Sequence, residues 1–205
     1  KECQYTKQSL ELIHLYGFGV SITTKSDLIL RDMDLLKKIN QKNDVIVQIT
    51  ITTADDELCK KIEPGVCVSS KRFEVIKTLG QEGIFTGILL SPVLPFITDT
   101  EENIKKIVQL AHQNGAKFIY TYMGMTLRDD QRDYYYKKLD ELFPHMRSQY
   151  EKNYRNYYLC ISLNRRRLYY VFQKECEKYG ILYKMEDIIK AYRAKIEKKE
   201  QMSFF

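Results

Sequence analysis

The stretch VIVQITITT, residues 45–53, decides the fold, because its run of β-branched residues predicts a buried strand. Three further β-type runs repeat the pattern: FGVSITT (18–24), GIFTGILLS (83–91) and KFIYTYM (117–123). Helical spacing of apolar residues predicts helices before and between them, over residues 6–16, 32–40, 71–81 and 99–114. Strands that alternate with helices predict right-handed βαβ units and a parallel sheet.

The strand spacing suits either a (β/α) barrel or a doubly wound sheet. No strand is followed by GxGxxG or GxxxxGK[ST], so Rossmann-type and P-loop nucleotide binding are disfavoured. With 205 residues, 44% of them hydrophobic and 29% charged, the chain has room for one domain and an appendage. No apolar run approaches the roughly 18 residues of a membrane span, and no secretory signal opens the sequence.

The cysteines and histidines argue against a self-contained metal site. Five cysteines without a CxxC pair favour a reducing, cytoplasmic location over a disulfide scaffold: Cys3, Cys59, Cys67, Cys160 and Cys176. The three histidines are far apart in sequence, so we expect no zinc site: His14, His112 and His145.

The positive charge is confined to the C-terminal part of the chain. Residues 1–127 contain 15 Lys/Arg and 15 Asp/Glu, whereas residues 128–205 contain 18 against 12, which is the whole excess of +6. Twelve of the 16 tyrosines lie there too. We therefore divide the chain into a sheet part, 1–127, and a basic, Tyr-rich helical extension, 128–205, with helices near 129–143, 164–179 and 185–198. Such a tail can follow a phosphate backbone and stack bases. The favoured alternative, which is compatible with it, is a helical cap whose tyrosines bury their rings against the barrel and leave their hydroxyls in solvent.

Polar residues end every predicted strand, and in (β/α) barrels such residues face the active site. The candidates are Lys25, Ser26, Thr50, Thr52, Ser91 and Tyr122. Each has a plainer reading: threonine is common in strands, and Lys25 suits a solvated loop. Glu63 and Arg72 can form an ion pair that pins a loop. The pair Ser69-Ser70 reads as a helix cap.

Three strings together are similar to the radical SAM superfamily, in the branch related to spore photoproduct lyase. They are TTKSDLILRDMDLL (23–36), VQITITTADDELCKKIEP (47–64) and KRFEVIKTLGQEGIFTGILLSPVLPFITDTEENI (71–104). The resemblance implies a (β/α)6 partial barrel. It also implies a [4Fe–4S] cluster held by CxxxCxxC, which an external donor reduces so that S-adenosylmethionine yields a 5′-deoxyadenosyl radical for hydrogen abstraction.

The sequence departs from this family by lacking CxxxCxxC and two of the six βα units. Because cluster ligands must lie close together, we expect a fragment of a longer protein, inactive alone, whose cluster ligands lie in a missing N-terminal region. The strand at 18–24 would then have a bare edge, covered by the chain's own N-terminal helix or tail or paired in a homo-oligomer.

The resemblance assigns roles to the strand ends. Lys25 would bind the methionine carboxylate, with Ser26 beside it, and Thr50 would meet the ribose, with Thr52 two residues on. The segment 87–91, ending at Ser91, would run beside the adenosyl group, and 120–123, with Tyr122, would contact adenine. No catalytic residue is assigned.

Three functions remain open from the sequence. The first is the radical SAM enzyme, with an unknown and large substrate for which the basic tail favours nucleic acid. The second is a cluster-free module that binds nucleic acid or protein through the tail. The third is a (β/α)-barrel lyase or isomerase with Lys25 as Schiff-base nucleophile.

Overall fold

A four-stranded parallel sheet forms the centre of the molecule, seen in a computed structural model that describes residues 4–200, with side chains through residue 193. The strands are β1 (Val20–Thr24), β2 (Val45–Thr50), β3 (Phe85–Leu90) and β4 (Ile119–Thr121), and they lie side by side in chain order. This confirms the predicted α/β class, a partial parallel barrel sheet of four βα units.

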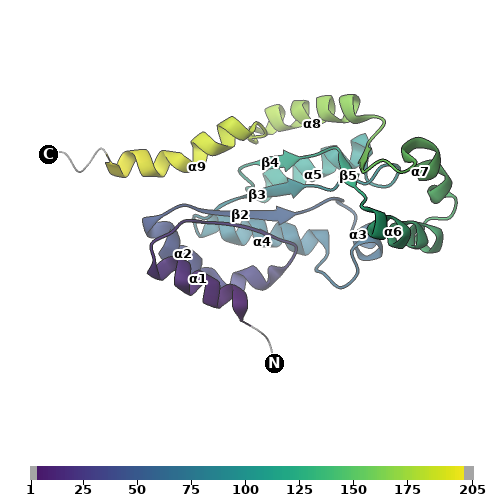
Figure 1. Cartoon of the computed structure of the whole chain (residues 1–205). Helices are drawn as coiled ribbons and strands as arrows, with labels where there is room; N and C mark the ends of the chain where they lie inside the picture. The colour runs from purple at the N-terminus through teal and green to yellow at the C-terminus, as the bar shows by residue number, and fades with distance from the viewer. Residues whose placement is uncertain (1–3, 201–205) are drawn as a thin grey trace.

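Helices connect and flank these strands. The N-terminal part contains α1 (Tyr5–Leu15), the 3-10 helix η1 (Asp27–Asp32), α2 (Met33–Lys42), α3 (Asp56–Ile62), α4 (Ser69–Gln81) and α5 (Glu101–Gln113). Figure 1 shows α1 and α2 on the side of the molecule away from β4, whereas α8 (Arg165–Tyr179) and α9 (Met185–Glu200) run beside β4. Thr100 caps α5 by accepting from the Asn103 N–H at 3.2 Å.

One face of the sheet is buried against helices. In β2, the alternate residues Val45, Val47 and Ile49 are at most 1% exposed and belong to the main hydrophobic cluster, together with Leu36 and Ile76 of α2 and α4. Because side chains alternate along a strand, the remaining β2 residues point to the opposite face, the inner face of the partial barrel.

The two edges of the sheet end differently. Beyond β4, Leu182 lies as a parallel bridge to Phe118, and its backbone bonds Lys117 and Ile119. Beyond β1, no described segment adds a strand, since β1 pairs with β2 alone. The bare edge predicted there is present, and α1 packs on α2 instead. Pairing of that edge in a homo-oligomer stays a prediction.

The C-terminal extension joins the sheet part rather than standing apart. Its α8 packs along α5, and Leu168, Phe172 and Cys176 lie in the main cluster. A smaller sheet pairs β5 (Gly124–Thr126) with β6 (Leu159–Ile161) antiparallel, beside α6 (Asp129–Leu142) and α7 (Met146–Tyr154). Division at residue 127 stays a prediction.

Five of the described elements were not predicted from the sequence: η1, α3, α7, β5 and β6. The two strands have only three residues each, too short for a period-2 pattern, and α3 begins at a cap, Asp55, inside a run that reads as a polar loop. Nowhere in residues 4–200 does a helix have the length and apolarity needed to cross a membrane.

Candidate functional site

Most of the predicted site residues lie at the carboxyl edge of the sheet, where the pairing of the strands aligns them. Thr24 pairs with Ile49, Thr50 with Leu89, and Leu89 with Tyr120, so Lys25, Thr50, Leu89 and Tyr120 form one row across the four strands. Thr50 has inner-face parity, because Ile49 and Ile51 on either side belong to the buried face.

A second row follows two residues further along. Thr52, Ser91 and Tyr122 lie two positions beyond Thr50, Leu89 and Tyr120, just past the ends of β2, β3 and β4. Thr52 is buried, whereas Tyr122 is 37% exposed. The sheet therefore gathers five of the six predicted residues along one edge.

The sixth predicted residue, Ser26, has the opposite parity to Lys25 and makes hydrogen bonds to its near neighbours in the chain. Its hydroxyl accepts from the Leu28 N–H at 3.1 Å and caps η1, while its own N–H donates to Thr24 Oγ1 at 3.0 Å. Ser26 thus fixes the sharp turn by which the chain leaves β1 just after Lys25. These two hydrogen bonds give a structural explanation for a serine at the position after Lys25.

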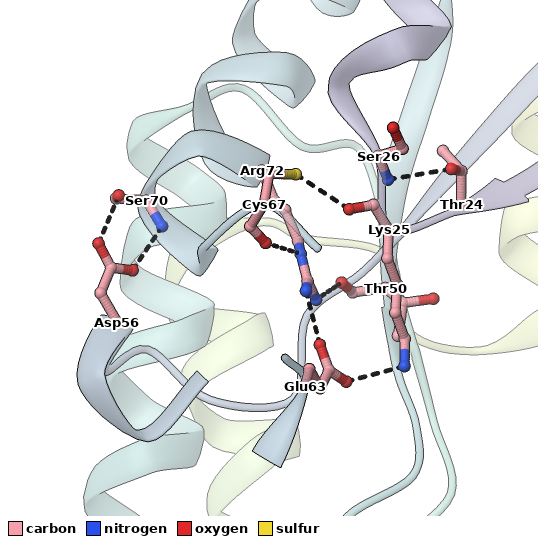
Figure 2. A network of polar contacts seen from close by, with 9 residues as sticks. All are labelled: Thr24, Lys25, Ser26, Thr50, Asp56, Glu63, Cys67, Ser70 and Arg72. Atoms are coloured by element: carbon pink, nitrogen blue, oxygen red, sulfur yellow. Dashed lines mark hydrogen bonds and ion pairs between the residues drawn. The ribbon is translucent and has the colours of Figure 1, made fainter. Parts of the chain in front are cut away.

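Lys25 does not lie free in solvent, because its Nζ pairs with Glu63 Oε1 at 2.8 Å. Glu63 follows α3 and lies between two cations, since its Oε2 is 2.6 Å from Nη2 of Arg72. Figure 2 shows the carboxylate between the ammonium and the guanidinium. The lysine side chain is 38% exposed and the glutamate 11%, so the group of three has a net charge of +1 and opens to solvent at the lysine.

Arg72 ties the end of β2 to the loop between α3 and α4. Its side chain is 1% exposed, and it donates from Nη1 to the Thr50 carbonyl at 2.9 Å and from Nε to the Cys67 carbonyl at 2.7 Å. The Cys67 thiol in turn donates to the Lys25 carbonyl at 3.0 Å. The ion pair of Glu63 and Arg72 that the sequence allowed is thus present, and it does pin a loop (Figure 2).

The Ser69-Ser70 pair is not the cap that the sequence suggested. Helix α4 already includes both serines, and Val68 stands at the N-cap without a side-chain bond. The carboxylate of Asp56 performs this role instead, because it accepts from the Ser70 N–H at 2.9 Å and from the Ser70 hydroxyl at 2.6 Å. This bond joins the first turn of α3 to that of α4 (Figure 2).

Gly87 opens the segment 87–91 that the resemblance places beside the adenosyl group, and the space at this glycine is filled by a side chain. A Cβ on Gly87 would lie 2.4 Å from the Phe118 carbonyl oxygen and 2.5 Å from its ring. The Phe118 ring also stacks on Phe85, with centroids 5.3 Å apart. The glycine therefore makes space for the aromatic pair, which leaves Leu89 and Ser91 as the β3 positions closer to the open edge.

A cavity of about 920 Å³ lies at the end of β4, next to the predicted row. Its wall includes Thr121 at the end of β4, the next residues Tyr122 and Met123, the segment from Ile161 to Arg167, and Tyr169. It holds three arginines and no carboxylate. The carboxyl edge therefore has two halves. We call Lys25, Thr50, Glu63 and Arg72 the paired half, and we call Tyr122, Arg165, Arg166 and Tyr169 the open half.

Buried tyrosines of the extension support the segment that leads from β3 to α5. The Tyr150 hydroxyl is buried, donates to the Pro95 carbonyl at 2.7 Å and accepts from the Tyr135 hydroxyl at 2.9 Å. Burial raises the pKa of Tyr135 to about 12 and that of Tyr150 further. Tyr136, Tyr150 and Tyr154 thus bury their rings as the cap hypothesis expected, whereas Tyr157 remains exposed. The hypothesis was wrong about the hydroxyls of Tyr150 and Tyr154, which donate to the carbonyls of Pro95 and Ile161 instead of lying in solvent.

The four described cysteines do not form a cluster site. Cys59, Cys160 and Cys176 are buried, and burial raises the pKa of the Cys176 thiol to about 12, which disfavours the thiolate that a metal binds. Cys3 lies outside the described residues. Within the part of the chain that the structure describes, no three Cys, His, Asp or Glu side chains converge as metal ligands would.

No protein-family model matches the chain. An uncharacterised protein of Mycobacterium tuberculosis H37Rv is 29% identical over 139 residues, which are 68% of this chain and 41% of that protein. One from Methanocaldococcus jannaschii is 43% identical over 82 residues, 40% of this chain and 30% of the relative. The chain thus spans less than half the length of these relatives.

Among solved structures, spore photoproduct lyase has a similar fold. A mutant of that enzyme with bound AdoMet and dinucleoside spore photoproduct gives a TM-score of 0.64 at 13% identity, over 88% of this chain and 55% of the other. A second mutant gives 0.62 at 12% identity with the same coverage. At these identities the likeness shows a common fold.

Proposed function

We propose that this chain is the S-adenosylmethionine-binding part of a radical SAM enzyme. The observation that carries the proposal is the inner-face row at the carboxyl edge, with an accessible ammonium at Lys25 and hydroxyl or ring groups at the next strand ends. A structure of similar fold has AdoMet bound. The superfamily strings in the sequence include the same lysine and threonines.

The charges and hydroxyl groups of these residues suit this cofactor. Lys25 would hold the carboxylate of the methionine moiety, since its environment has a net charge of +1 and its tip is open to solvent. Thr50 and Thr52 would face the ribose, and Ser91 and Tyr122 would lie along the adenosine. When bound, the cofactor supplies the means to abstract a hydrogen atom from a substrate.

Glu63 would act on the cofactor through Lys25. It fixes the ammonium at 2.8 Å, and the buried Arg72 keeps Glu63 itself in place. Without this support the long lysine side chain would have to be ordered by the ligand alone, at a cost in side-chain entropy. We therefore assign Glu63 and Arg72 as positioning residues.

The described cysteines do not fit a [4Fe–4S] cluster, so we derive no step through one. We propose that the cluster ligands, and the donor that reduces the cluster, lie outside these residues, in a longer parent protein that is cytoplasmic. The free cysteines Cys59, Cys67, Cys160 and Cys176 agree with such a reducing compartment. Alone, the chain would bind the cofactor without turning it over.

Titration calorimetry with S-adenosylmethionine tests the proposal. We expect Lys25→Met, which keeps most of the side-chain volume, to weaken binding at least about tenfold, or roughly 1.4 kcal/mol. The control is Lys37→Met, which removes another paired but exposed lysine on α2 and leaves binding unchanged. Equal affinity of wild type and Lys25→Met, or no binding by the wild type, would refute the role of the row.

A further inference from the structure

The cavity at the open half has the composition of an anion site. The eleven residues that line it include Arg165, Arg166 and Arg167 and no Asp or Glu. Arg167 is occupied, because its Nε donates to Glu101 Oε1 at 2.7 Å. Arg165 and Arg166 are exposed and form no ion pair with any residue whose side chain the structure describes.

The positions of these arginines are fixed by the backbone. They belong to the first turn of α8, a fifteen-residue helix whose first turn contains no acidic side chain and whose N-cap, Asn164, makes no side-chain cap bond. The preceding segment is held against β4 and β5, since the Ser162 N–H donates to the Met123 carbonyl at 3.0 Å. Ser162 Oγ also donates to Asp99 Oδ2 at 2.6 Å. The two guanidinium groups therefore extend from a braced turn.

Aromatic rings lie in the same wall. Tyr122 comes from the end of β4 and Tyr169 from the second turn of α8, and they are 37% and 39% exposed. Tyr169 is backed by Phe172, with ring centroids 5.9 Å apart. Arginines beside accessible tyrosine faces form the combination that binds single-stranded nucleic acid, by pairing with phosphates and by stacking bases.

The size and place of the cavity narrow the ligand further. About 920 Å³ suits one or a few nucleotides rather than the broad surface of a duplex. The wall includes Tyr122, which is also the last position of the predicted cofactor row, so a base in this cavity would lie beside that row.

We infer that the open half binds a nucleotide segment of single-stranded nucleic acid, with Arg165 and Arg166 on its phosphates and Tyr169 stacked on a base. The inference rests on the proposed function only for the reaction that the bound nucleotide would undergo. Binding of the nucleic acid does not depend on it. Binding can therefore be measured without S-adenosylmethionine, and its failure is distinct from failure of the lysine test.

The experiment is fluorescence anisotropy with a labelled ten-nucleotide oligothymidylate, titrated with the full chain at several salt concentrations. We expect the double variant Arg165→Ala/Arg166→Ala to bind about tenfold or more weakly. We also expect its slope of log affinity against log salt to shrink by about 1.4, for two phosphate contacts at about 0.7 each. The control Lys38→Ala/Lys77→Ala removes the same charge from exposed positions of α2 and α4 and keeps wild-type affinity.

A second pair of variants tests the stacking. We expect Tyr169→Ala to weaken binding about tenfold and Tyr169→Phe, which keeps the ring, to bind as the wild type does. Equal loss in the arginine and lysine double variants would mean only a general charge effect and would overturn the inference. Tighter binding of a duplex of the same sequence, or displacement of the oligonucleotide by equimolar inorganic phosphate, would overturn it as well.

Discussion

The paired and open halves of the carboxyl edge satisfy their charges in different ways. At the paired half, Glu63 neutralises one of the two positive charges, and Arg72 also donates hydrogen bonds to two backbone carbonyls. At the open half, Arg165 and Arg166 extend into a cavity without a carboxylate in its wall. The contrast teaches that charge alone does not identify a ligand site. Whether the fold has already paired a charge indicates which kind of ligand that charge suits.

The difference assigns a task to each half. A preorganised ion network holds a small ligand at a fixed place, whereas unpaired arginines and accessible rings accept a flexible polymer. The predictions that follow would break or sharpen this comparison, and they are ordered by expected effect.

Removing Arg72 should have the largest effect, because it breaks the paired half from within. We expect Arg72→Met to lower the free energy of unfolding by about 3–5 kcal/mol, since Glu63 loses a buried partner and the carbonyls of Thr50 and Cys67 lose their donor. Urea unfolding followed by circular dichroism measures this loss. The matched control, Arg147→Met, removes an exposed arginine and should cost less than about 1 kcal/mol. A small loss in Arg72→Met would mean that the network does not hold the edge.

The open half has its own support, and Tyr150 tests it. We expect Tyr150→Phe to lower the free energy of unfolding by about 1–3 kcal/mol, because the Pro95 carbonyl and the Tyr135 hydroxyl both lose a buried partner. Tyr134→Phe, which alters a 66% exposed residue of α6, should change nothing measurable in the same urea titration. Equal stability of the Tyr150 and Tyr134 variants would contradict a supporting role for this hydroxyl.

The smallest effect concerns pH and the hydrogen bond between Ser162 and Asp99 beside the cavity. Burial raises the pKa of Asp99 above its ordinary 3.8, so the folded state holds this proton more tightly than the unfolded state does. This contribution to stability is therefore largest at low pH and declines as the pH rises from about 3.8 through the folded pKa. In Asp99→Asn, we expect this decline in stability with rising pH to be absent. Thermal unfolding of the two proteins between pH 3.5 and 7 checks it, and parallel profiles would refute it.

The sequence predicted the sheet well because each strand has a strong local signal. The run from Val45 to Thr50 is β-branched and buried, and the cap at Thr100 needs only its neighbours. The positions at the carboxyl edge could be predicted as well, because parallel strands end on the same side of a sheet. The register then aligns Lys25 with Thr50. That much is decided by local pattern and handedness.

The rest depends on contacts between residues far apart in the chain. Glu63 lies 38 positions after Lys25, and nothing local predicts that they pair. The triple arginine was visible at 165–167, but its cavity exists only because β6 returns to β5, through strands too short to be recognised. Asp56, rather than a serine of α4 itself, caps that helix for the same reason.

The most direct test of the account measures both ligands on both halves. Lys25→Met and Arg165→Ala/Arg166→Ala would each be titrated with S-adenosylmethionine and with the oligothymidylate, beside the wild type. We predict a double dissociation: the lysine variant loses only the cofactor, and the arginine variant loses only the oligonucleotide, each by about tenfold. If either variant lost both ligands while keeping its fold, or if neither lost the ligand assigned to it, the division of the edge would be wrong.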